Sequence, residues 1–149
     1  MKTVHSGHWE QVEQVNKFAN RAADHHLQTL VAQYSEPGNI RVLDLGCAGG
    51  RNTVFLLQKG FKVWAVDQSS AMIAETQRRC LESWPPSRCE GIQVGNMIQL
   101  QPFESGFFDL IVALGVYHNA QSESEFYAAL SESSRVLRPG GDLLISVFM

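Results

Sequence analysis

The sequence of 149 residues lacks long apolar runs and basic clusters, and each absence excludes a class of protein. No stretch approaches the roughly 18 apolar residues that a transmembrane helix needs, and the first residues lack the apolar run of a signal peptide. With 12 Lys and Arg against 15 Asp and Glu, the net charge is -3. Phosphate binding needs a basic stripe, so we predict a cytoplasmic domain that binds neither a membrane nor nucleic acid.

Paired cysteines are also missing, since the chain has 3 cysteines without any C-x-x-C spacing. An odd number without close pairs favours neither a disulfide framework nor a four-ligand zinc site. His5 and His8 are spaced for one face of a helix, but two histidines alone do not complete a metal site. We therefore expect no bound metal.

Hydrophobic patterning changes its period along the chain. Residues 9–34 carry apolar side chains at helical spacing, with Trp9 as a core anchor, and Pro37-Gly38 ends the pattern. Beyond that point, nearly continuous apolar runs alternate with amphipathic stretches. Such runs are typical of strands buried on both faces of a parallel sheet covered by helices. Strands are predicted at residues 40–45, 61–66, 92–94, 108–114 and 143–148, and helices at 51–59, 69–81 and 122–137.

The most informative run is Val42-Leu43-Asp44-Leu45-Gly46-Cys47-Ala48-Gly49-Gly50, where a predicted strand enters a loop of small residues before a helix. Ligands bind at the carboxyl ends of strands in open α/β sheets, and small residues let a ligand approach the backbone. The dinucleotide pattern G-x-G-x-x-G fails, because the third and sixth positions from Gly46 are Ala48 and Arg51. Asp44 would repel a pyrophosphate, whereas it favours a positively charged ligand toward which it would point.

This run resembles motif I of class I S-adenosylmethionine (SAM)-dependent methyltransferases, an acid followed by Gly-x-Gly-x-Gly. Ala48 replaces the middle glycine, a change that we expect the loop to accept with a negative φ. Further segments keep the order of the family: Asp67 after the second predicted strand, Asn96-Met97 after the third, and the run RVLRPGG at residues 135–141 before the fifth. The resemblance covers about residues 40–149.

The resemblance implies a Rossmann-like three-layer sandwich, mostly a parallel sheet of about five strands flanked by helices, with SAM as cofactor. Residues 1–36 would form an N-terminal helical segment and residues 37–149 the SAM-binding domain. Asp67 is expected to accept hydrogen bonds from the ribose hydroxyls and Asn96 to contact the adenine amino group. The candidate cofactor-binding residues are Asp44, Gly46, Cys47, Ala48, Gly50, Asp67, Gln68, Asn96, Met97 and Leu114.

The implied reaction is an in-line displacement that moves the methyl group of SAM to a small-molecule acceptor. The run at residues 50–52 is similar to small-molecule and tellurite-resistance-type methyltransferases. Because the cofactor carries the reactive group, the protein mainly binds and orients, and a general base is optional. Tyr117 and His118, after the fourth predicted strand, are the candidate catalytic residues, although a core tyrosine and an ordinary loop histidine are equally open readings.

The family fold has seven strands, and the last two are absent from this sequence. The apolar strand predicted at residues 143–148 would then lie near the sheet edge, which is a hazard for pairing. A trimmed chain, a homodimer that covers this strand, and a reduced domain that binds SAM without turnover are three alternatives. A nicotinamide-dependent oxidoreductase fragment and a non-catalytic SAM-binding module also stay open. Identification of the bound cofactor would distinguish the oxidoreductase fragment from a methyltransferase. Turnover with a panel of acceptors would distinguish the non-catalytic module from an active enzyme.

Overall fold

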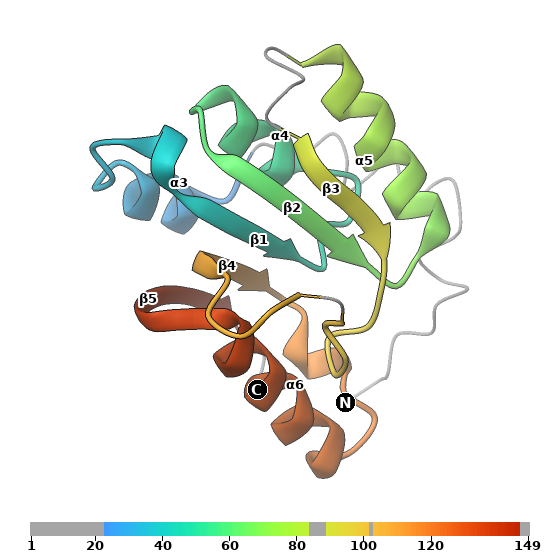
Figure 1. Ribbon diagram of the computed structural model, residues 1–149. Helices are drawn as coiled ribbons and strands as arrows, with labels where there is room; N and C mark the ends of the chain where they lie inside the picture. The colour runs from blue at the N-terminus through green and yellow to red at the C-terminus, as the bar shows by residue number, and fades with distance from the viewer. Residues whose placement is uncertain (1–22, 84–88, 102, 147–149) are drawn as a thin grey trace.

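The computed structural model describes residues 23–83, 89–101 and 103–146, and its centre is a five-stranded sheet (Figure 1). The strands follow the order β3-β2-β1-β4-β5, and every neighbouring pair is parallel. The predicted α/β fold with a parallel sheet of about five strands flanked by helices is therefore confirmed. The strands are β1 (Arg41–Leu45), β2 (Lys62–Asp67), β3 (Cys89–Val94), β4 (Phe108–Leu114) and β5 (Leu137–Ser146).

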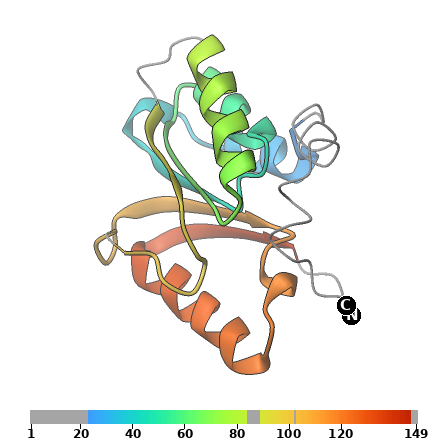
Figure 2. The ribbon, with the colours of Figure 1, turned by 90° about the vertical axis from the view of Figure 1, so that its right-hand side faces the viewer.

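Helices cover both faces of the sheet, which gives three layers. Figure 2 shows α6 on one side and α3, α4 and α5 on the other. The helices of the described residues are α3 (His25–Val31), α4 (Arg51–Gln58), α5 (Ser70–Glu82) and α6 (Glu123–Val136), with the short 3-10 turns η1 (Pro37–Asn39) and η3 (Tyr117–Asn119). None of the helices in these described ranges has the length and apolar character needed to span a membrane.

Two apolar cores form because successive residues of a strand point to opposite faces of the sheet. Val42 of β1 packs in one cluster with Leu27 of α3 and Leu56 of α4. Its neighbour Leu43 belongs to the opposite cluster, together with Val136 of α6. All five side chains are fully buried, and each such burial contributes about 1.5–3 kcal/mol. The two cores hold the strand ends of β1, β2 and β4 in fixed register.

Within the described residues, the helical pattern predicted over residues 9–34 is interrupted at Asp24 and ends at Val31. Residues 9–34 suggested one continuous helix, but α3 begins only at His25, because Asp24 has extended backbone and its carboxylate accepts the N–H groups of His26 and Leu27. An aspartate that bonds to these amides is a strong helix start. His5, His8 and Trp9 lie outside the described residues.

The last strand begins earlier than predicted. We expected Pro139-Gly140-Gly141 to turn the chain before a strand at residues 143–148, yet β5 already starts at Leu137. Leu137 pairs with Phe108, Asp142 pairs with Leu110, and the register shifts between these two pairs. Between these two pairs β5 contains more residues than β4, and it accommodates them as an irregularity within the strand.

Candidate cofactor-binding site

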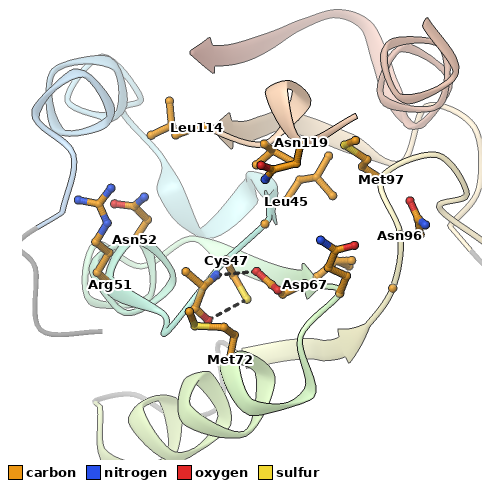
Figure 3. Close-up of a pocket in the computed structure, with 17 residues that line it drawn as sticks. Leu45, Cys47, Arg51, Asn52, Asp67, Met72, Asn96, Met97, Leu114 and Asn119 are labelled. Atoms are coloured by element: carbon orange, nitrogen blue, oxygen red, sulfur yellow. Dashed lines mark hydrogen bonds between the residues drawn. The ribbon is translucent and has the colours of Figure 1, made fainter. Parts of the chain in front are cut away.

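A pocket lies at the carboxyl ends of β1, β2 and β4 (Figure 3). In the strand order β3-β2-β1-β4-β5, the chain extends from β1 to one side through β2 and β3, and then to the other through β4 and β5. Such a reversal of strand order leaves a crevice at which open α/β sheets bind ligands. Its wall includes eight of the predicted cofactor-binding residues: Gly46, Cys47, Ala48, Asp67, Gln68, Asn96, Met97 and Leu114.

The loop after β1 is held against β2 by its own backbone. The amides of Gly46 and Cys47 both donate to the carbonyl oxygen of Val66, at 2.7 and 3.1 Å. Gly50, with φ +93°, then leads directly into α4. The loop therefore presents backbone and small side chains to the pocket, as the sequence predicted, although Gly50 itself is not part of the pocket wall.

Ala48 adopts a backbone conformation that we did not expect. From the sequence we expected a negative φ, but the φ of Ala48 is +52°, in the left-handed region that side chains with a Cβ disfavour. Two hydrogen bonds hold it there. The Ala48 amide donates to Asp67 Oδ2 at 2.9 Å, and Thr76 Oγ1 donates to the Ala48 carbonyl oxygen at 2.7 Å. The loop keeps its glycine-like turn because its neighbours offset the strain.

The carboxylate of Asp67 connects three parts of the site. One oxygen accepts the amide of Ala48 and the other accepts the amide of Ser69, each at 2.9 Å. The residue ends β2 and lines the pocket. A carboxylate oxygen can accept more than one hydrogen bond, so both oxygens can also bind hydroxyl groups of a ligand. The predicted ribose contact fits this position.

Asp44 lies beneath the loop and not in the pocket wall. Its side chain is buried, and it accepts a hydrogen bond of 2.6 Å from Thr53 Oγ1 of α4. The expectation that this carboxylate points toward the ligand does not hold, because the chain folds α4 over it. The pKa of Asp44 is raised to about 6: burial raises it most, the negative charge of Asp67 adds to the rise, and the Thr53 hydrogen bond and the positive charge of Arg51 oppose it.

We predict that Asp44→Asn stabilises the protein at pH 7.5 by about 1–2 kcal/mol relative to the parent chain. A carboxyl whose pKa is higher in the folded state than its unfolded value of 3.8 binds a proton on folding, so its ionisation costs stability above pH 6 and not below pH 4. Asparagine removes that cost and keeps an oxygen for Thr53. Urea unfolding from pH 4 to 8 measures it: the difference between the two proteins should vanish toward pH 4, and a difference independent of pH would contradict the prediction.

The far end of the pocket is built after β3. Asn96 and Met97 line it, and Asn96 Oδ1 already accepts the amide of Ile98 at 3.0 Å. The predicted adenine contact therefore has to use the remaining capacity of this oxygen or the amide nitrogen.

Cys47 forms part of the floor, where burial holds the pKa of its thiol well above the usual range. It is a neutral wall residue at pH 7.

The two predicted catalytic residues do not reach the pocket wall. Tyr117 is fully buried in the core beside α6, and its hydroxyl shares a hydrogen bond with Ser133 Oγ. His118 is partly buried, which lowers its pKa, and it is also absent from the wall. Asn119, the next residue of η3, lines the pocket instead. A 3-10 turn rotates each residue by about 120°, so only one of these three neighbours can face the site.

Arg51 and Asn52 at the start of α4 also line the pocket, and sequence reasoning had not selected them as site residues. Asn52 Oδ1 accepts the backbone amide of Asp24 at 3.0 Å, which ties the start of α3 to this rim. Near it, the ligating atoms of Asp24, His25 and His26 lie within 4.8 Å of one another, a spacing at which three groups could hold a metal. The capping bonds of Asp24 already account for that arrangement.

Comparison with known proteins agrees with this geometry. Residues 42–141 match the family described as "Methyltransferase domain". The chain is 35% identical over 120 residues to the demethylmenaquinone methyltransferase of Beutenbergia cavernae, covering 80% of this chain and 45% of that protein. It is 30% identical over 114 residues to the tRNA (carboxymethyluridine(34)-5-O)-methyltransferase alkbh8 of Xenopus tropicalis, covering 76% of this chain and 16% of that protein. The chain thus spans less than half the length of these curated relatives.

Solved structures share the fold. The PH0226 protein of Pyrococcus horikoshii OT3 superposes with a TM-score of 0.65 at 27% identity, over 91% of this chain and 59% of that one. The protein solved in complex with the Haloferax volcanii Trm112 methyltransferase activator reaches a TM-score of 0.74 at 20% identity, over 97% of this chain and 61% of that one. The chain therefore belongs to the methyltransferase domain family and is a class I SAM-dependent methyltransferase domain.

Proposed function

We propose that this chain transfers the methyl group of SAM to a small-molecule acceptor. The observation that carries the proposal is the position of Asp67 directly beside the glycine-containing loop, with both around one pocket at the reversal of strand order. A carboxylate at this point can accept two ribose hydroxyls, while the loop at residues 46–48 leaves room for the methionyl part of the cofactor. Membership of the methyltransferase domain family supports the same assignment.

The residues of the pocket suit SAM chemically. SAM carries a sulfonium and an ammonium, and the carboxylate of Asp67 supplies a negative charge in the wall. Leu45, Met97 and Leu114 provide apolar surface for the adenine and the methionyl carbons. Arg51 offers the cationic partner that the carboxylate of the methionyl group would need. The donor set therefore fits a zwitterionic nucleoside better than a pyrophosphate.

The chain contributes mainly by positioning. SAM supplies an activated methyl group when bound, and the protein aligns the nucleophile of the acceptor with the methyl carbon and the sulfur. Such alignment contributes about 7–11 kcal/mol to lowering a barrier. Among the described residues that line the pocket, none is His, Lys or Tyr. The arrangement favours an acceptor that needs no strong base, and loss of its proton to water completes the reaction.

Several observations support a small molecule as the acceptor. The net charge of -3 disfavours a polyanionic substrate. Relatives named as quinone-pathway enzymes match the chain, the demethylmenaquinone methyltransferase and the ubiquinone biosynthesis O-methyltransferase of Xanthomonas axonopodis pv. citri. Proteins named as tRNA methyltransferases match as well. The run at residues 50–52 is the feature that favours the small-molecule and tellurite-resistance-type subgroup, and a panel of acceptors would decide between the classes.

The edge strand β5 supports a homodimer in the same proposal. Leu143 and Ile145 are two residues apart in β5 and therefore point to the same face of the strand, where they are 37% and 38% exposed. A second copy that covers this strand would remove apolar surface from water and pair the free edge. Within the described residues, the buried thiols of Cys47 and Cys80 are not joined in a disulfide, which suits the reducing cytoplasm in which we place the protein.

Thermal unfolding with SAM, its demethylated product S-adenosylhomocysteine (SAH) and NAD tests the proposed cofactor. A ligand at about 100 times its Kd stabilises a protein by about 2.7 kcal/mol, which corresponds to a rise in Tm of about 5–10 °C for a domain of this size. We expect this rise with SAM and SAH and none with NAD. A rise with NAD alone would overturn the proposal. Binding of SAM without SAH formation from any acceptor would favour the non-catalytic module.

A further inference from the structure

Among the described residues that line the pocket, Asn119 carries a buried side-chain atom without a hydrogen-bond partner. The side-chain oxygen of Asn119 is buried, and it accepts no hydrogen bond from the described residues. Buried amide oxygens are almost always paired in folded proteins, because an unpaired one keeps the cost of losing its water. Asn119 lines the pocket, so a rotation of its amide about the Cβ–Cγ bond would turn this oxygen toward a ligand whose N–H or O–H group supplies the missing donor.

The position of Asn119 separates it from the nucleoside end of the pocket. It is the last residue of η3, which follows β4, and the other wall residues here are Leu114, the last residue of β4, and Gly115 and Val116 of the connection. Among the described residues of this connection, Asn119 is therefore the only one with a polar side chain in the pocket wall. Figure 3 shows it across the pocket from Asp67, with Leu45 between the two.

The chemistry of SAM relates these two side chains. If Asp67 binds the ribose hydroxyls, the sulfur is attached to the ribose through a single methylene group and must lie near the centre of the pocket, over the end of β1. Its methyl group then has two directions in which to point, back into the loop or across toward the β4 connection. The loop at residues 46–48 is closed by its bonds to Val66, Asp67 and Thr76, which leaves the side of Asn119 for the incoming nucleophile.

We propose that Asn119 Oδ1 accepts a hydrogen bond from the N–H or O–H group of the methyl acceptor and holds its nucleophilic atom in line with the methyl group. The inference rests on the proposed function and narrows its substrate class to hydroxyl or amine acceptors that enter with a proton. The lone pair of the oxygen or nitrogen forms the new bond to the methyl carbon as the carbon–sulfur bond breaks, and its electrons remain on the sulfur of SAH. The proton passes to water, because an amide is no base.

Sinefungin tests this placement without a known acceptor. It is a SAM analogue that carries an amine at the position of the transferred methyl group, so the amine would donate to Asn119, whereas SAH has nothing there. By calorimetric titration we expect sinefungin to bind the parent chain about tenfold more tightly than SAH, the size of one charge-assisted hydrogen bond. Asn119→Ala should remove most of this preference while the Kd of SAH changes by less than about threefold.

Two further variants make the result specific. Asn119→Asp keeps the acceptor oxygen and adds a charge, so it should retain or increase the preference for sinefungin. Asn96→Ala, at the other end of the pocket, should weaken both ligands alike and leave their ratio unchanged. An unaltered ratio in Asn119→Ala would overturn the inference. Equal weakening of both ligands would overturn it too, since Asn119 would then bind the ammonium group that both share.

The same titrations separate the inference from the function on which it rests. If the parent chain binds SAH and SAM and only the ratio test fails, the role of Asn119 is wrong and the proposed cofactor stands. If the parent chain binds neither nucleoside, the proposed function is wrong and the inference falls with it. If Asn119→Ala does not fold, Asn119→Asp decides the result, because loss of the preference there contradicts an acceptor role.

Discussion

Replacement of Asp67 by Ala should lower the affinity for SAM by about a hundredfold or more. Each hydrogen bond to a charged group contributes about 1.5–3 kcal/mol, and in the proposed binding mode two ribose hydroxyls would lose their acceptor together. The loss has a second component, because the same carboxylate accepts the amides of Ala48 and Ser69. Without it the loop after β1 and the start of α5 each lose a partner, so we also expect the unfolding free energy without ligand to fall by about 1–3 kcal/mol.

Titration with SAM, together with urea unfolding, measures the two components separately. Gln68 is the next residue, is exposed and lines the same pocket as a candidate cofactor-binding residue. Because its side chain is uncharged, we expect Gln68→Ala to raise the Kd for SAM less than Asp67→Ala does. His118→Ala should retain binding, because His118 is not in the pocket wall. Equal affinities of the Asp67 and His118 variants would show that the carboxylate does not hold the cofactor.

The position of Asp67 was predictable from sequence because it depends on local rules. A nearly continuous apolar run predicts a buried strand, parallel strands end at one edge of a sheet, and the residue that ends the strand lies at that edge. The same reasoning placed Asn96 and Leu114 in the pocket wall, as found. A serine before an amphipathic stretch also predicts a helix start, for which Ser69 and Ser70 were both candidates, and the structure shows Ser69 as the cap of α5.

Other features depend on contacts that a sequence pattern does not contain. The positive φ of Ala48 is maintained by bonds to Asp67 and Thr76, which are 19 and 28 residues away along the chain. Asp44 is covered by α4 because Thr53 folds back to bond with it. Which of Tyr117, His118 and Asn119 lines the pocket depends on how the short turn η3 is rotated about its axis. Such outcomes are set by tertiary packing, so a motif identifies the loop correctly and still misplaces a side chain within it.

Gly46 is the loop residue with the least tolerance for substitution, and Gly46→Ala should lower the unfolding free energy by about 2–4 kcal/mol. Its φ is +72°, a left-handed conformation that costs about 1–2 kcal/mol for a residue with a Cβ. In addition, a Cβ at this position would lie 2.4 Å from Val116 Cγ2, far inside contact distance. Val116 lines the pocket, so its displacement should also weaken SAM binding.

The two causes can be separated by urea unfolding of a double variant. Val116→Ala removes the clashing methyl groups, since the Val116 Cβ itself would lie 3.5 Å from the new Cβ at position 46. In the Val116→Ala background, Gly46→Ala should therefore cost only the left-handed strain, about 1–2 kcal/mol. Ala48→Gly is the converse control, because relief of the same strain two residues later should stabilise the chain by about 1 kcal/mol. If Gly46→Ala costs as much in the Val116→Ala background as in the parent chain, crowding is not the cause, and backbone conformation alone makes glycine necessary where the loop leaves β1.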